Sequence, residues 1–64
     1  MNLDNKQETL EELREGAKEL RELNASICTK FSIPVHKREL LSDQLLSTRD
    51  SLNIFIGMLD AILN

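Results

Sequence analysis

Apolar residues recur along the first half of the chain at steps of three and four residues. This spacing is typical of an amphipathic helix that packs one stripe against another helix, and it predicts a helix over about residues 4–31. The same spacing predicts one more seam position between Leu20 and Ile27, and that position is occupied by Asn24. Asn24 either lies in the seam and fixes the register, or lies at its edge while Leu23 turns inward. The apolar seam positions are Leu10, Leu13, Ala17, Leu20, Ile27 and Phe31.

The second half of the chain repeats the same alternation of threes and fours. It predicts a second helix over about residues 34–63, close in length to the first. Its predicted seam consists of Leu41, Leu45, Thr48, Leu52, Phe55, Leu59 and Ile62.

A turn over residues 32–36 separates the two predicted helices. Pro34 disfavours a helical conformation at the preceding residue and is tolerated in the first turn of a new helix. Ser32 is a suitable N-cap for that helix. Two helices of similar length and a short connection predict an all-α, antiparallel two-helix hairpin that forms a single domain over residues 1–64.

The second helix has more apolar side chains than one seam can bury. We expect Leu52, Phe55, Leu59 and Ile62 to close the hairpin, and a second stripe to remain, which is large enough to be an interface. The hairpin is therefore predicted to assemble into a homo-oligomeric helical bundle, as a four-helix dimer or a larger ring. That second stripe comprises Leu46, Asn53, Ile56 and Leu63, with Ile54, Met58 and Ala61 beyond it. The residues assigned to the oligomer interface are Leu52, Phe55, Ile56, Met58, Leu59, Ile62 and Leu63.

Chain length supports the same conclusion. A core built from 64 residues is marginal, and chains of this size usually need a disulfide, a metal or another subunit. Cys28 is the only cysteine, so no disulfide can form within the chain. Cys28 and His36 alone are too few for a zinc site, and no cofactor motif is present, which leaves oligomerisation as the expected stabiliser.

Charge and hydropathy restrict the possible partners and compartment. The formal net charge of −3 disfavours binding to a nucleic-acid backbone. Residues 1–7 are polar and no apolar signal region follows them. The apolar C-terminal stretch is too short and too polar to span a membrane. Together with a free thiol, these features predict a cytoplasmic protein.

Charge is also segregated along the chain, with seven acids and four bases in residues 1–22. The turn is basic, with Lys30, His36, Lys37 and Arg38. Basic side chains beside a helix N-terminus can bind an anion, although they can equally form a solvated turn.

Arg49 and Asn53 form a second candidate binding pair. Arg49 can bind a phosphate or a carboxylate, or it can form a surface pair with an acid of the first helix. His36 has no nucleophile or carboxylate at a spacing that implies a catalytic triad, and no metal-binding or phosphate-loop motif occurs. The expected protein is therefore not an enzyme, with no catalytic residue, metal or cofactor.

The segment "STRDSLNIFIGMLDAIL", Ser47–Leu63, resembles the second helix of the small helical-hairpin sponge proteins of bacteriophages. The similar features are the Thr48–Arg49 pair, Leu52 three residues later, and a small and apolar run that follows. The resemblance implies an oligomer that sequesters a nucleotide immune signal, with Arg49 and Asn53 in contact with the ligand.

Two functions are therefore expected from the sequence. The first is a non-enzymatic anti-defence protein that oligomerises and sequesters a small anionic nucleotide through Arg49, Asn53, Lys37 and Arg38. The alternative is an adaptor or antirepressor whose apolar second helix docks on a partner protein. An adaptor should leave Ile54, Met58 and Ala61 exposed in the free protein, whereas a nucleotide sponge should bring its cations together across a subunit boundary.

Overall fold

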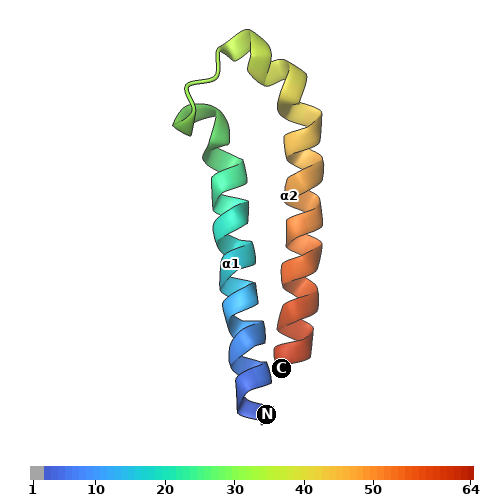
Figure 1. Cartoon of the computed structure of the whole chain (residues 1–64). Helices are drawn as coiled ribbons and strands as arrows, with labels where there is room; N and C mark the ends of the chain where they lie inside the picture. Colours follow the sequence, from blue (N-terminus) through green and yellow to red (C-terminus); the bar gives the residue numbers. More distant parts are fainter. Residues whose placement is uncertain (1–2) are drawn as a thin grey trace.

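The computed structural model describes residues 3–64, and side chains from Gln7 onward. It consists of two helices, α1 (Leu3–Lys30) and α2 (Val35–Leu63), and the described residues contain no strand. The helices run antiparallel and pack side by side, so both chain ends lie at one end and the turn at the other (Figure 1). The hairpin measures 50 × 19 × 14 Å. The prediction of an all-α hairpin is confirmed, and the helices begin and end within about one residue of their expected limits.

The first helix ends at Lys30, and Ser32, two residues later, adopts a positive φ of 52°. This left-handed residue allows the Ser32 N–H to donate to the Thr29 carbonyl at 3.2 Å and the Ile33 N–H to the Cys28 carbonyl at 2.9 Å. The pair of bonds is a Schellman motif, which satisfies the last carbonyl groups of a helix. The prediction that Ser32 caps the second helix is therefore wrong, because Ser32 terminates α1 instead.

The second helix is capped by the backbone of Pro34, without a side-chain hydrogen bond. The Pro34 carbonyl accepts the N–H groups of both Lys37 and Arg38 at 3.0 Å. The Arg38 Nε donates to the Ile33 carbonyl at 2.7 Å. This basic side chain therefore braces the turn by binding a carbonyl of the connection.

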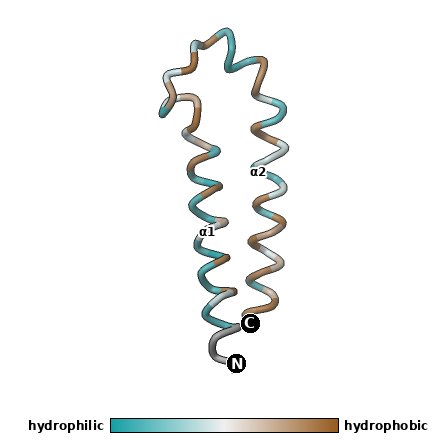
Figure 2. The backbone as a smooth tube through the Cα atoms, in the orientation of Figure 1, coloured by the Kyte–Doolittle hydropathy of each residue, from teal (hydrophilic) through white to brown (hydrophobic). Residues whose placement is uncertain are grey.

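The hairpin buries very little of its apolar surface. Ala17 of α1 and Ile56 and Leu59 of α2 are the only hydrophobic residues among those described that are buried. Figure 2 shows that hydrophobic positions are denser along the C-terminal half of α2 than along α1. Much of the apolar surface of α2 therefore remains uncovered by α1.

The seam of α2 differs from the predicted one at Leu41, which is 40 % exposed, and again after Leu52. Ile56 is 5 % exposed, whereas Phe55 is 38 % and Ile62 is 62 % exposed. Placing Phe55 and Ile62 in the hairpin core, and Ile56 and Leu63 outside it, was therefore wrong. The inward positions are Leu45, Thr48, Leu52, Ile56, Leu59 and Leu63, with a mean spacing of about 3.6 residues, which is that of a straight α-helix.

The seam of α1 also differs from the apolar pattern. Leu13, Leu20 and Phe31 are exposed, although their spacing predicted burial. Asn24 does lie in the seam, where its Nδ2 donates to the Leu45 carbonyl at 2.9 Å, and Leu23 is half-buried beside it. The inward positions include Leu10, Arg14, Ala17, Arg21, Asn24, Ile27 and Cys28, so the predicted inward placement of Leu10, Ala17 and Ile27 is confirmed.

Candidate functional site

One broad side of the hairpin is polar, and its side chains join the two helices. Arg14 Nη1 donates to Asp60 Oδ1 at 3.0 Å, and Arg21 Nη1 donates to Asn53 Oδ1 at 2.9 Å. The Arg14 Nε is buried and has no hydrogen-bond partner among the described residues. We call this side the polar face, defined by Arg14, Arg21, Arg49, Asn53 and Asp60.

Two guanidinium groups of the polar face flank Asn53. Arg21 reaches it from α1, and Arg49 precedes it by one turn of α2. Arg49 binds the neighbouring carboxylate, since its Nη2 lies 3.2 Å from Asp50 Oδ1. Arg21 hydrogen-bonds a neutral amide, and the described residues place no carboxylate oxygen within ion-pair distance of it. Arginine in this setting can bind a phosphate in bidentate fashion.

The predicted site residues are thus only partly brought together. Arg49 and Asn53 share one side of α2, and Arg21 joins them, which the sequence analysis missed. The sequence signal for Arg21 was its position next to Leu20, a predicted seam residue. Lys37 and Arg38 lie twelve and eleven residues before Arg49, or about 17 Å along the helix axis. A single hairpin therefore does not combine the turn cations with Arg49 and Asn53.

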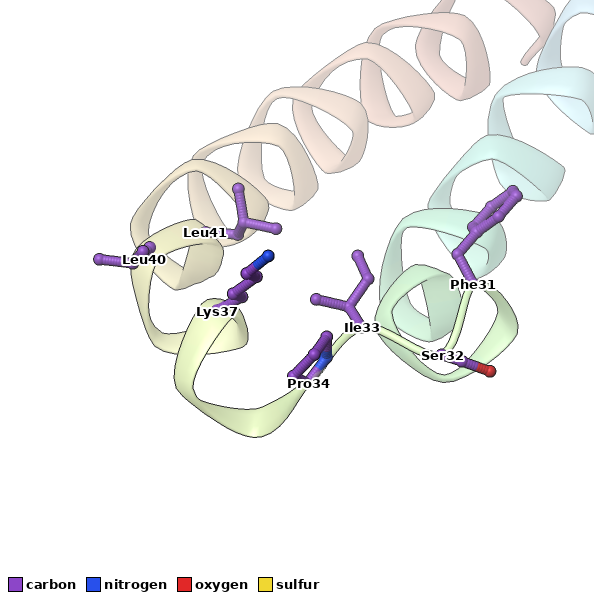
Figure 3. A pocket seen from close by; sticks show the side chains of 7 residues that line it. All are labelled: Phe31, Ser32, Ile33, Pro34, Lys37, Leu40 and Leu41. Atoms are coloured by element: carbon purple, nitrogen blue, oxygen red, sulfur yellow. The ribbon is translucent and has the colours of Figure 1, made fainter.

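The turn holds an apolar pocket beside its basic side chains. Its volume is about 460 Å³. Figure 3 shows the Lys37 ammonium directed toward the space between Ile33 and Leu41, while the Ser32 hydroxyl points away. Arg38 is committed to the Ile33 carbonyl. The pocket is lined by Phe31, Ser32, Ile33, Pro34, Lys37, Leu40 and Leu41.

A second open apolar depression lies between the helices, on the side away from the polar face. Its volume is about 510 Å³. Phe55 enters it from α2, two residues after Asn53, which places the two side chains about 200° apart around the helix. A Cβ added at Gly16 would meet no atom within 4 Å, so no helix of the hairpin approaches closely there. The lining residues are Thr9, Glu12, Leu13, Gly16, Ala17, Leu20 and Phe55.

Other candidate chemistry is sparse over the described residues. No three His, Cys, Asp or Glu side chains among them are grouped as a metal site would require. Cys28 is a half-buried free thiol. Neither helix, over the described stretch, offers an apolar segment that could cross a membrane.

Comparisons with known proteins assign no role to these residues. No protein-family model, curated protein or solved structure matches the chain.

Proposed function

We propose that this protein is a non-enzymatic binding protein that sequesters a nucleotide-type anion on its polar face, through Arg21, Asn53 and Arg49. The observation that carries the proposal is the pairing of Arg21 with a neutral amide instead of a carboxylate. No carboxylate competes with a ligand for a guanidinium group in this state. The neighbouring Arg49, which pairs with Asp50 at 3.2 Å at an exposed position, supplies a second guanidinium group. The Asn53 amide can bind a base or a ribose hydroxyl.

A thermal-shift and calorimetric titration tests the proposal. The probes are a cyclic dinucleotide and cyclic ADP-ribose, with inorganic phosphate as the simplest anion. A probe at 100 times its Kd stabilises the fold by about 2.7 kcal/mol, which raises the Tm of a chain this small by about 10 °C or more. Absence of a shift with both nucleotide probes would refute sequestration.

Charge-matched variants separate a specific site from general attraction. Arg21→Gln and Arg49→Gln should each weaken nucleotide binding about tenfold or more, because a hydrogen bond to a charged group contributes about 1.5–3 kcal/mol. Lys18→Gln removes the same charge from α1, where Lys18 pairs weakly with Glu15 at 3.8 Å, and should change affinity less than twofold. Equal losses in all three variants would indicate a diffuse charge effect and contradict the site.

Docking on a partner protein is the second candidate, and the outer strip of α2 favours it. Ile54 is 66 % exposed, and Met58 and Ala61 are exposed beside it. Residues spaced in this way can lie in a hydrophobic groove as one face of a helix. A photo-crosslinker at Ile54 should then join one defined partner in host cells, whereas a crosslinker at Glu19 of α1 should not. Equal labelling from both positions would contradict this alternative.

A further inference from the structure

The side of the hairpin opposite the polar face is apolar along its length and has no cover. The side chains on this side are large and hydrophobic, yet the single hairpin leaves them exposed; Leu20 is 55 % exposed. We call this side the groove face, defined by Leu13, Leu20, Phe31, Leu41, Phe55 and Ile62. The depression at Leu20 and Phe55 and the pocket at the turn both open along it.

The exposed area of the chain is that of a subunit rather than of a compact monomer. The hairpin exposes 5158 Å², whereas a compact protein of 7.3 kDa exposes about 4,200 Å². The excess is about 1,000 Å², and a standard protein interface buries about 800 Å² on each partner. Covering the groove face with one further molecule therefore accounts for the surplus.

Charge along the hairpin sets the direction of that second molecule. Five glutamates surround a shallow depression on the chain-end half of α1, namely Glu8, Glu11, Glu12, Glu15 and Glu19. The turn carries Lys30, His36, Lys37 and Arg38, and Lys37 lines its apolar pocket. An antiparallel copy brings each basic turn to the acidic half of the other molecule, whereas a parallel copy brings the two basic turns together.

We propose that a second copy of this chain covers the groove face, as a two-fold symmetric four-helix dimer in which the two hairpins lie antiparallel. The apolar side chains at Leu20 and Phe55, near the middle of the hairpin, then lie close to the two-fold axis. The turn pocket of each copy faces the chain-end half of its partner. This interface leaves the polar face exposed. The dimer can therefore be absent while nucleotide binding persists, and nucleotide binding can be absent while the dimer persists.

Pulsed dipolar spectroscopy measures the direction directly. A nitroxide label at His36→Cys, in a full chain that also carries Cys28→Ala, marks the turn end of each copy. The hairpin is 50 Å long and 19 Å wide, so antiparallel copies place the labels about 40 Å apart or more. Parallel copies place them within about 20 Å. A distance in the shorter range overturns the antiparallel arrangement.

Light scattering at micromolar concentration tests whether the groove face forms the dimer. The wild-type chain should have twice the monomer mass. Leu20→Glu should reduce it to the monomer mass, since a carboxylate would be buried at the axis. Ile54→Glu is the matched control on the outer side of α2 and should keep the dimer mass.

Each other outcome overturns the proposal. A wild-type monomer means that no second copy covers this face, and a trimer or larger ring excludes the two-fold arrangement. Loss of the dimer in Ile54→Glu but not in Leu20→Glu would move the interface to the outer strip of α2. Far-UV circular dichroism of both variants distinguishes dissociation from unfolding, and Leu20 is exposed enough for the hairpin itself to tolerate the change.

Discussion

The left-handed conformation of Ser32 provides a sharp test of how the hairpin turns. An L-residue in this region of the backbone is disfavoured by about 1–2 kcal/mol, and glycine is the residue usually found at this position of a Schellman motif. Ser32→Gly removes the Cβ but keeps the N–H group that donates to Thr29 at 3.2 Å. The exposed Ser32 side chain points away from the turn pocket (Figure 3), so little packing is lost.

The expected gain in folding stability is smaller than the full conformational cost of the left-handed serine. Glycine also increases the entropy of the unfolded chain, which offsets about 0.5–1 kcal/mol. We therefore expect a net stabilisation of about 0.5–1 kcal/mol, seen as a rise in Tm of about 2–8 °C for a domain of this size. Thermal unfolding followed by circular dichroism measures it, at one fixed protein concentration because self-association would make the Tm concentration-dependent.

Ser47→Gly is the matched control for this substitution. Ser47 is exposed within α2, where glycine costs about 0.5 kcal/mol relative to serine, so the Tm should fall. Opposite signs for the two variants are the specific expectation. If Ser32→Gly also lowers the Tm, the positive φ at Ser32 is not the conformation in solution, and the account of the turn is wrong.

Substitutions at two inward positions, Ile56 and Asn24, test the packing between the helices. Ile56→Ala should cost about 2–4 kcal/mol in urea unfolding, whereas Ile54→Ala on the outer side of α2 should cost less than about 0.5 kcal/mol; equal costs would contradict the observed seam. Asn24→Ala should cost about 1 kcal/mol through the lost bond to the Leu45 carbonyl. Asn24→Leu should raise the Tm, because a leucine buries apolar area in the seam; a lower Tm would show that the Asn24 amide is needed to align the helices.

The helices and the turn could be predicted from the sequence because each rests on local signals. Pro34 marks the start of the second helix through its fixed φ and missing N–H group. The apolar periodicity identifies each helix regardless of which stripe faces inward. The role of Ser32 in ending α1 was harder to predict, since serine favours a helix N-cap and the left-handed position after a helix is usually occupied by glycine or asparagine.

The polar face could not be predicted in the same way. Arg14 and Arg21 occupy inward positions of α1, and a pattern of apolar residues assigns such positions to the surface. Arginine can lie there because its aliphatic stem packs against the seam while its guanidinium reaches Asp60 or Asn53 at the rim. Recognising Arg21 as a neighbour of Asn53 requires the register between the helices, which no single-chain periodicity supplies.

The change of phase in α2 links the core, the groove face and the outer strip. A strict alternation of threes and fours suits helices that supercoil, whereas a straight helix drifts by about 20° in each heptad. In α2 the step from Leu52 to Ile56 takes up this drift, and Ile56 is buried while Phe55 moves to the groove face. Ile54, one position earlier, then points to the outer side of the hairpin. Three consecutive apolar residues thus lie on three different surfaces, which explains why α2 carries more apolar side chains than one seam can bury.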